Sequence, residues 1–212
     1  MRLYSYSASA NCLKVRVLLA LLEVPCEIVE VDIFDGGTLT EEFGRLNPLR
    51  EVPVLELDDG SLLTQSGAIL SYLSEGTPWQ GTTRLGRAQV AAWLQIEQDR
   101  VVPGIGGVRF RLLTDRATAA ELAARIEAGS EILEILDSHL SGREWLVGEA
   151  PTIADLALWA YVHLAGDAGF DLSELPAVDA WCSRVGEIPG LVDDLTAYDA
   201  NARPGRGRSI YD

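Results

Sequence analysis

The chain has 212 residues, of which 48% are hydrophobic and 23% charged, and its formal net charge is −15. This composition is typical of a folded protein with one or two hydrophobic cores and excludes an intrinsically disordered chain. The excess of negative charge repels phosphate backbones and anionic lipids, so we expect neither nucleic acid nor a membrane surface as a partner.

The three cysteines, Cys12, Cys26 and Cys182, are widely spaced and form no C-x-x-C pair. This pattern favours free thiols in a reducing compartment over disulfides or zinc ligands. No apolar run has the length of a membrane span, and the N-terminus lacks the uninterrupted apolar stretch of a signal peptide. We therefore expect a cytoplasmic protein. We also expect no bound metal, since His139 and His163 lack metal-ligand spacing.

The first part of the chain alternates predicted strands and helices. Short β-prone runs predict strands at residues 2–6, 27–33, 52–57 and 61–64, and apolar residues three and four apart predict helices at 12–23, 38–48 and 66–76. A βαβ unit followed by a helix, a hairpin and a last helix is typical of a thioredoxin-like α/β domain with a four-stranded mixed sheet. We place this domain at residues 1–77.

Beyond about residue 85 the pattern predicts helices alone. They are expected at residues 85–113, with a kink at Pro103-Gly104, and at 116–142, 151–169 and 176–191. We expect an all-helical C-terminal domain at residues 85–212. Its Gly- and Arg-rich end, "ARPGRGRSIYD", is predicted to lie loosely on the surface.

Pro53 stands at the start of a predicted strand, where its missing N–H leaves two interpretations. It either begins the strand at an edge position, or it follows a cis peptide bond. In the second case the backbone groups of Val52 point outward and can pair with an extended peptide ligand.

Two predicted helix starts carry polar residues. Ser66 either caps its helix or joins the free N–H groups of the first turn in holding a carboxylate. In "SASANC", Ser9 or Asn11 either caps the next helix or stabilises a ligand thiolate. Lowering a thiol pKa by about two units requires roughly 2.7 kcal/mol. One or two hydrogen bonds and a helix dipole can supply this.

In their order and spacing, "SASANCLKVRVLLALLEVP", "LNPLREVPVLELDDGSLLTQSGAILSYL" and "WLVGEAPTIADLALWAYV" resemble the glutathione S-transferase family. The resemblance implies that Val52 pairs with the cysteinyl backbone of glutathione beside a cis Pro53, and that Gln65 and Ser66 hold its γ-glutamyl end. It gives the thiolate-stabilising role to Ser9, as in serine-type bacterial-like branches, with Asn11 second.

Residues near these positions are assigned other roles. Ser5 and Ser7 are weaker candidates for the thiolate donor, and Cys12 is interpreted as a packed helix residue. In "TIAD", Thr152 and Asp155 form a capping box with a role in folding.

Two departures from the family pattern concern ligand charge. The family commonly has Gly or Gln and then Lys or Arg before "VP", but here Arg50-Glu51 stands there, and Arg50 is the candidate partner for the glycyl carboxylate. Neutral Gln65 replaces a common Glu, so an acid from a partner subunit, Glu97 or Asp99, would have to compensate.

The resemblance implies a homodimeric detoxification enzyme that transfers glutathione to a small electrophile. Two alternatives remain: a glutathione-dependent disulfide or peroxide reductase or isomerase, and a non-enzymatic dimeric scaffold. The electrophile site is expected between the domains, lined by "VVPGIGGVRFRLL" and residues near Tyr161. Arg109 and Arg111 either favour an anionic substrate there or, as we expect, are solvated surface charges.

Overall fold

The computed structural model describes residues 1–212 and divides into two compact units. The first contains Met1–Leu73 and Val192–Asp212, and the second contains Ser74–Leu191. The sequence had predicted residues 85–212 as one domain with a loose tail, and this is wrong for the C-terminal segment. Arg208 N–H donates to the Phe34 carbonyl at 2.7 Å, and Ala202 is 1% exposed, so the segment packs as part of the first unit.

The first unit contains a four-stranded mixed sheet in the order β2-β1-β3-β4. Strand β1 runs parallel to β2 and antiparallel to β3, which is antiparallel to β4. The strands are β1 Arg2–Ser5, β2 Glu27–Glu30, β3 Val54–Glu56 and β4 Leu62–Thr64. This topology confirms the predicted thioredoxin-like domain.

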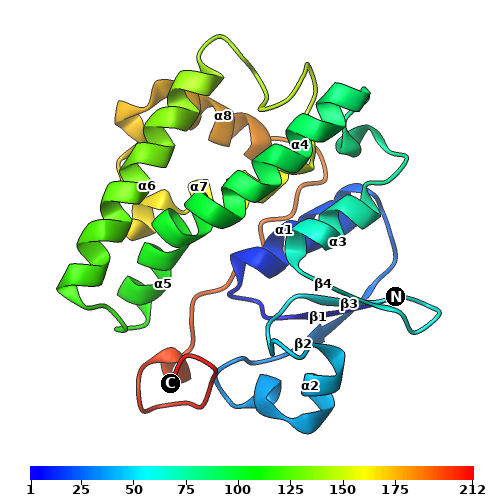
Figure 1. Ribbon diagram of the computed structural model, residues 1–212, viewed down its shortest axis with the longest axis vertical. Helices are drawn as coiled ribbons and strands as arrows, with labels where there is room; N and C mark the ends of the chain where they lie inside the picture. Colours follow the sequence, from blue (N-terminus) through cyan, green and yellow to red (C-terminus); the bar gives the residue numbers. More distant parts are fainter. The chain divides into compact units, whose positions relative to one another are not determined.

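Helices α1 (Ala10–Leu21) and α3 (Ser66–Leu73) pack together beside the sheet (Figure 1). Their apolar side chains pack on one face of the sheet. That face carries Leu3 of β1 and Leu55 of β3, because alternate residues of a strand point the same way. The next residue of β1, Tyr4, points to the opposite face and meets Phe43 of α2 (Glu41–Leu46) edge to face. The sheet therefore lies between α1 and α3 on one side and α2 on the other.

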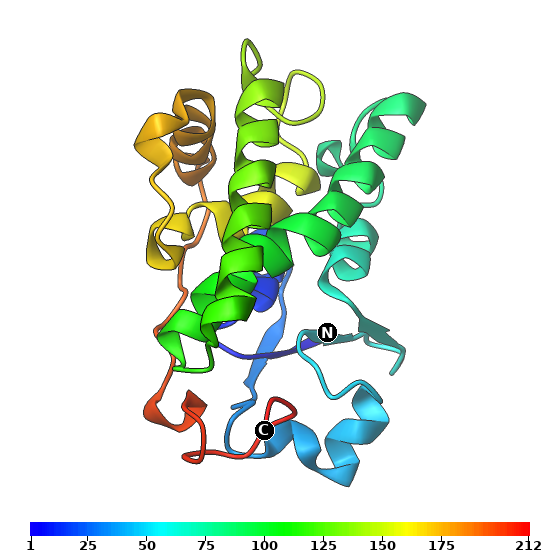
Figure 2. The same ribbon diagram turned by 60° about the vertical axis from the view of Figure 1, so that its left-hand side comes forward.

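The second unit is all-helical, as predicted (Figure 2). Its helices are α4 Arg84–Ile96, α5 Gly107–Leu113, α6 Ala119–Leu140, α7 Ile153–Val162 and α8 Pro176–Gly186, with a π-helical segment at Glu97–Gly106 between α4 and α5. Pro103 lies within this π-helical segment, where the sequence had predicted a kink. The segment packs on α6, where Gly104 and Gly129 approach so closely that a Cβ on Gly104 would come within 3.0 Å of the Gly129 backbone.

Helix α7 forms the centre of the second unit, and every one of its residues is buried. The predicted capping box at its N-terminus is present, with Asp155 accepting hydrogen bonds from the N–H and hydroxyl of Thr152. None of the helices has both the length and the apolar composition that crossing a bilayer requires.

Candidate functional site

The loop between β1 and α1 presents Ser9 at the N-terminus of α1. Ser9 has an extended backbone (φ −89°, ψ 119°), and its hydroxyl oxygen accepts the Cys12 N–H at 3.4 Å. The hydroxyl also forms a hydrogen bond with the Cys12 thiol, and it can rotate to donate to another group instead. Ser9 is half-buried and lies where the helix dipole favours negative charge. Ser9 thus combines a hydroxyl donor with the positive end of the α1 dipole.

Asn11 lies in the first turn of α1, not in the loop where the sequence pattern had placed it, because the Ser9 cap starts the helix at Ala10. Its side-chain oxygen accepts the hydroxyl of Ser66 at 3.1 Å. Ser66 is 4% exposed and is the first residue of α3. This hydrogen bond joins the two helix N-termini, so the two polar helix starts recognised in the sequence lie together.

The structure excludes one of the two interpretations of Ser66, the cap of its helix. Its hydroxyl is directed to Asn11, whereas the preceding Gln65 occupies the cap position and accepts the Ile69 N–H through its carbonyl at 3.0 Å. Gln65 has a φ of +68°, an uncommon value for a residue with a side chain, and such backbone strain clusters at functional sites.

The peptide bond between Val52 and Pro53 is cis, as the family resemblance implied. Strand β3 begins only at Val54 and lies between β1 and β4, so it is a central strand and cannot accept an added strand. Val52 precedes the paired region and its backbone groups take part in no hydrogen bond within the chain. Its N–H and C=O are thus available for pairing with a peptide-like ligand.

The Arg50 guanidinium forms hydrogen bonds within the protein. Its guanidinium donates to the carbonyls of Thr38 and Thr40 at 3.0 and 2.9 Å and packs against Gly44. These bonds hold the segment before α2, and they reduce the capacity of Arg50 to bind a ligand carboxylate.

Glu51 lies beside Gln65, with its carboxylate oxygen 3.4 Å from the Gln65 amide nitrogen. The sequence did not indicate this proximity, because the two residues come from different segments. Glu97, one of the two acids expected from a partner subunit, is fully buried within its own chain and is not available for that role. Glu51 places an acidic group next to Gln65 without a second subunit.

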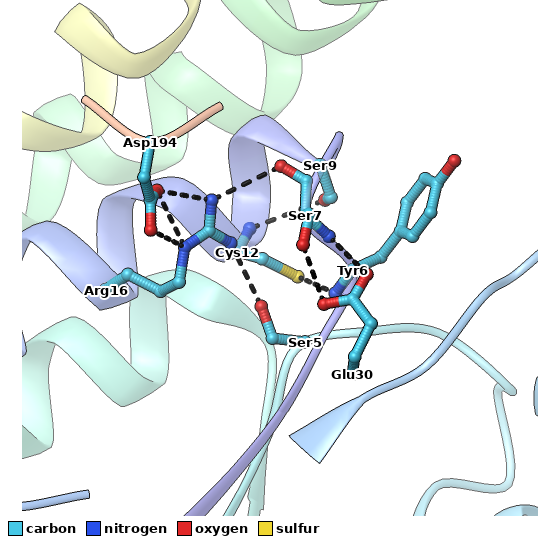
Figure 3. Close-up of polar contacts among 8 residues, drawn as sticks. All are labelled: Ser5, Tyr6, Ser7, Ser9, Cys12, Arg16, Glu30 and Asp194. Atoms are coloured by element: carbon cyan, nitrogen blue, oxygen red, sulfur yellow. Dashed lines mark hydrogen bonds and ion pairs between the residues drawn. The ribbon is translucent and has the colours of Figure 1, made fainter. Parts of the chain in front are cut away.

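The other candidates in the first loop are bound to protein groups. Ser5 is fully buried and accepts from Arg16 at 3.0 Å, and the Ser7 hydroxyl donates to Glu30 at 2.8 Å (Figure 3). Cys12 is fully buried, as expected for a packed helix residue, and burial raises the pKa of its thiol. Of the three serine hydroxyls of this loop, that of Ser9 is therefore neither fully buried nor bound to a carboxylate.

The prediction that Arg109 is a solvated surface charge is wrong. Arg109 is 7% exposed, and its guanidinium donates to Asp167 at 2.9 Å. No local sequence pattern indicated this pair, since the two residues are far apart in the chain. In the same unit Gly106 packs against Tyr161 so closely that a Cβ would lie 2.5 Å from the ring.

Two family models match the chain. The model described as the glutathione S-transferase N-terminal domain matches residues 8–75, and the model of the C-terminal domain of the same family matches residues 104–189. A glutathione S-transferase from Xanthobacter autotrophicus Py2 has a similar solved structure, with 42% identity and a TM-score of 0.86. The match covers 90% of this chain and 95% of that one.

Relatives with other names are similar over most of the chain, at lower identity. A maleylacetoacetate isomerase of Dictyostelium discoideum is 31% identical, with 95% of this chain and 96% of the relative covered. The disulfide-bond oxidoreductase YfcG of Escherichia coli is 28% identical, with 87% and 89% covered. Ure2p, solved in complex with glutathione, is 25% identical with a TM-score of 0.83 over 92% of this chain and 97% of that one.

The models match well over half of the chain, and their boundaries agree with a thioredoxin-like unit followed by helices. The cis peptide bond, the capped α1 and the polar start of α3 are the features that the family resemblance implied for this sequence. The protein belongs to the glutathione S-transferase family.

Proposed function

We propose that this protein binds glutathione in its first unit and activates the thiol for attack on a small electrophile. The observation that carries the proposal is the hydrogen bond between Ser66 and Asn11, because it joins the N-termini of α1 and α3 beside Ser9. Bound glutathione would supply a sulfur nucleophile. The chain would supply binding groups for its peptide backbone and charges, and a donor for its sulfur.

The chemistry of the available groups fits such a ligand. The open backbone of Val52 offers one donor and one acceptor, which suits the cysteinyl amide of an extended peptide. The free N–H groups in the first turn of α3 favour the γ-glutamyl carboxylate. Glu51 and Gln65 lie beside each other and suit the γ-glutamyl ammonium. In this proposal Arg50 supports the loop and is a weaker candidate for the glycyl carboxylate.

Ser9 is the group we assign to the sulfur. A hydroxyl donor at a helix N-terminus lowers a thiol pKa, since both the hydrogen bond and the dipole stabilise the negative form. Asn11 holds the hydroxyl of Ser66 and thereby orients the binding group of α3. The proton released from the thiol passes to solvent.

Calorimetric titration with reduced glutathione tests the proposal. We expect the wild type to bind and Ser66→Ala to bind about ten-fold more weakly, because the hydrogen bond to Asn11 that orients the start of α3 is lost. We expect Ser9→Ala to bind normally but leave the thiol protonated. Ser71→Ala, an exposed hydroxyl of the same helix, is the matched control. Absence of binding at about 10 mM, corresponding to a binding free energy weaker than about −2.7 kcal/mol, would refute the proposal and favour a scaffold.

The names of the relatives motivate a second candidate function, a glutathione-dependent isomerase or disulfide reductase. Its first step would be the same binding and activation of the glutathione thiol. An activity panel with an aryl halide and hydroxyethyl disulfide separates the two. Aryl transfer that is lost in Ser9→Ala supports the transferase, and disulfide turnover without aryl transfer supports the reductase. A homodimer is also part of the proposal, and sedimentation of the purified protein tests it.

A further inference from the structure

The segment that follows α8 returns to the first unit and packs along the loop before α1. Asp194 pairs with Arg16 of α1, and the Thr196 N–H donates to the Ser7 carbonyl at 3.3 Å. Further along, the Tyr198 ring packs against Tyr6, with ring centroids 6.4 Å apart. These residues lie far from the loop in sequence, and no local pattern predicted the contact.

Arg16 is the centre of this arrangement (Figure 3). Its Nε lies 2.9 and 3.0 Å from the two carboxylate oxygens of Asp194, and one Nη lies 2.7 Å from one of them, which gives a bidentate pair. The other Nη donates to the Ser5 hydroxyl at 3.0 Å, and the first Nη also reaches the Ser7 carbonyl at 3.3 Å. The Arg16 side chain is 8% exposed, so its orientation is fixed by packing as well as by these bonds.

The backbone and the side chain of Ser7 both form hydrogen bonds within the protein. Its carbonyl accepts from Arg16 and from the Thr196 N–H, and its own N–H and hydroxyl both donate to the Glu30 carboxylate at 2.8 Å. Ser7 lies two residues before Ser9, and the Ser9 N–H donates back to the Tyr6 carbonyl at 3.0 Å. The Ser9 hydroxyl therefore belongs to a loop whose position is fixed by hydrogen bonds to Arg16, Glu30 and the C-terminal segment.

We propose that the C-terminal segment is a strap whose Asp194–Arg16 pair holds the Ser7–Ser9 loop in the position that lets Ser9 stabilise a ligand thiolate. This rests on the proposed function. Arg16 contacts the loop and Asp194 acts through Arg16, so both are positioning residues. The charged and titratable groups around the loop are Arg16 and Cys12 from α1, Glu30 from β2, Asp32 after β2, and Asp194, Tyr198 and Asp199 from the strap.

The proposal predicts a shift in the thiol pKa that is opposite in direction to the shift from removing a charge alone. Replacing Asp194 by a neutral residue removes a negative charge, and that alone would make a nearby thiolate easier to form. Loosening of the loop has the opposite effect, because Ser9 loses its alignment with the sulfur and the thiolate becomes harder to form. The direction of the shift in the thiol pKa therefore distinguishes positioning from long-range electrostatics.

The experiment follows the ultraviolet absorbance of the thiolate of protein-bound glutathione across a pH titration, at saturating glutathione. In Asp194→Asn we expect the thiol pKa to rise by about one unit, which is about a ten-fold loss of thiolate below both values. Calorimetry should show a glutathione affinity within about two-fold of the wild type, since α3 and Val52 lie outside the strap contacts. Asp194→Glu keeps the carboxylate and should restore most of the thiolate.

Two further variants complete the test. Arg16→Lys keeps the charge but cannot reach Ser5, Ser7 and Asp194 together, so it should reproduce the upward shift. Glu27→Gln breaks an ion pair of the same type, with Arg2 at 2.9 Å, at the other end of the parallel strands, and should leave the thiol pKa unchanged.

The outcomes separate the two proposals. An unchanged or lowered thiol pKa in folded Asp194→Asn and Arg16→Lys overturns the strap. If the wild type binds glutathione without forming a thiolate, or does not bind it, the proposed function fails first. Circular dichroism of each variant establishes that it is folded before the titration is interpreted.

Discussion

Replacing Asp155 by Asn tests whether the buried capping box is a main source of stability in the second unit. The Asp155 carboxylate accepts four hydrogen bonds. One oxygen accepts from the Leu146 N–H at 2.9 Å and from the Trp181 indole at 3.0 Å, and the other accepts from the N–H and hydroxyl of Thr152 at 2.8 and 3.1 Å. Asp155 and Trp181 are both fully buried.

Asn has the same shape but only one accepting oxygen, so two of the four donors would face an amide NH₂. A buried donor that loses its partner costs about 1–3 kcal/mol. We therefore expect Asp155→Asn to lower the free energy of unfolding by about 4 kcal/mol. For a chain of this size that corresponds to a fall in Tm of about 8–15 °C.

Urea unfolding followed by circular dichroism measures the effect. Asp171→Asn is the matched control, because Asp171 also caps a helical turn, through Ser173 N–H at 2.9 Å, but it is exposed. It should cost no more than about 1 kcal/mol. A loss below about 1 kcal/mol in Asp155→Asn would show that water or a rearranged side chain satisfies these donors, and that the geometric reasoning is wrong.

Two other predictions concern Glu51 of the first unit and the three cysteine thiols. Glu51→Gln should weaken glutathione binding by about three-fold, as expected for one partly solvated charge pair. The effect should vanish with an N-acetylated ligand that has no ammonium, and tighter binding of glutathione to Glu51→Gln would contradict the assigned role. Burial raises the pKa of Cys12 and Cys26, and raises that of Cys182 to about 12, so all three thiols are protonated at neutral pH. Iodoacetamide at neutral pH should therefore label Cys26 slowly and Cys12 only after unfolding, as peptide mass spectrometry can check, whereas rapid labelling of Cys12 in the folded protein would contradict its burial.

Much of the fold could be predicted because its signals are local. The alternation of "EIVEVDI", the helical spacing after Ser9 and the "TIAD" cap each depend on residues within one element. Element boundaries were less accurate. Strand β2 ends at Glu30, where the pattern had continued to residue 33, because pairing with β1 stops at Ser5.

The candidate site was predictable in its residue types, while its connections came from the tertiary structure. The sequence indicated Ser9, Asn11, Val52 and Ser66 as separate polar positions at strand and helix ends. The hydrogen bond that joins Asn11 to Ser66 spans 55 positions of the chain and exists because α1 and α3 pack on the same face of the sheet.

The sequence by itself determined the two-part organisation and the order of strands and helices, because these follow from local periodicity, and the resemblance of its motifs indicated the family. Only the tertiary structure decided that the C-terminal segment returns to the first unit, that Arg109 is buried and that Arg16 pairs with Asp194. The physical reason is that an ion pair depends on distance in space. Arg16 and Asp194 are 178 positions apart in the chain, and only the packing of the whole unit brings them together. No local pattern records such a contact.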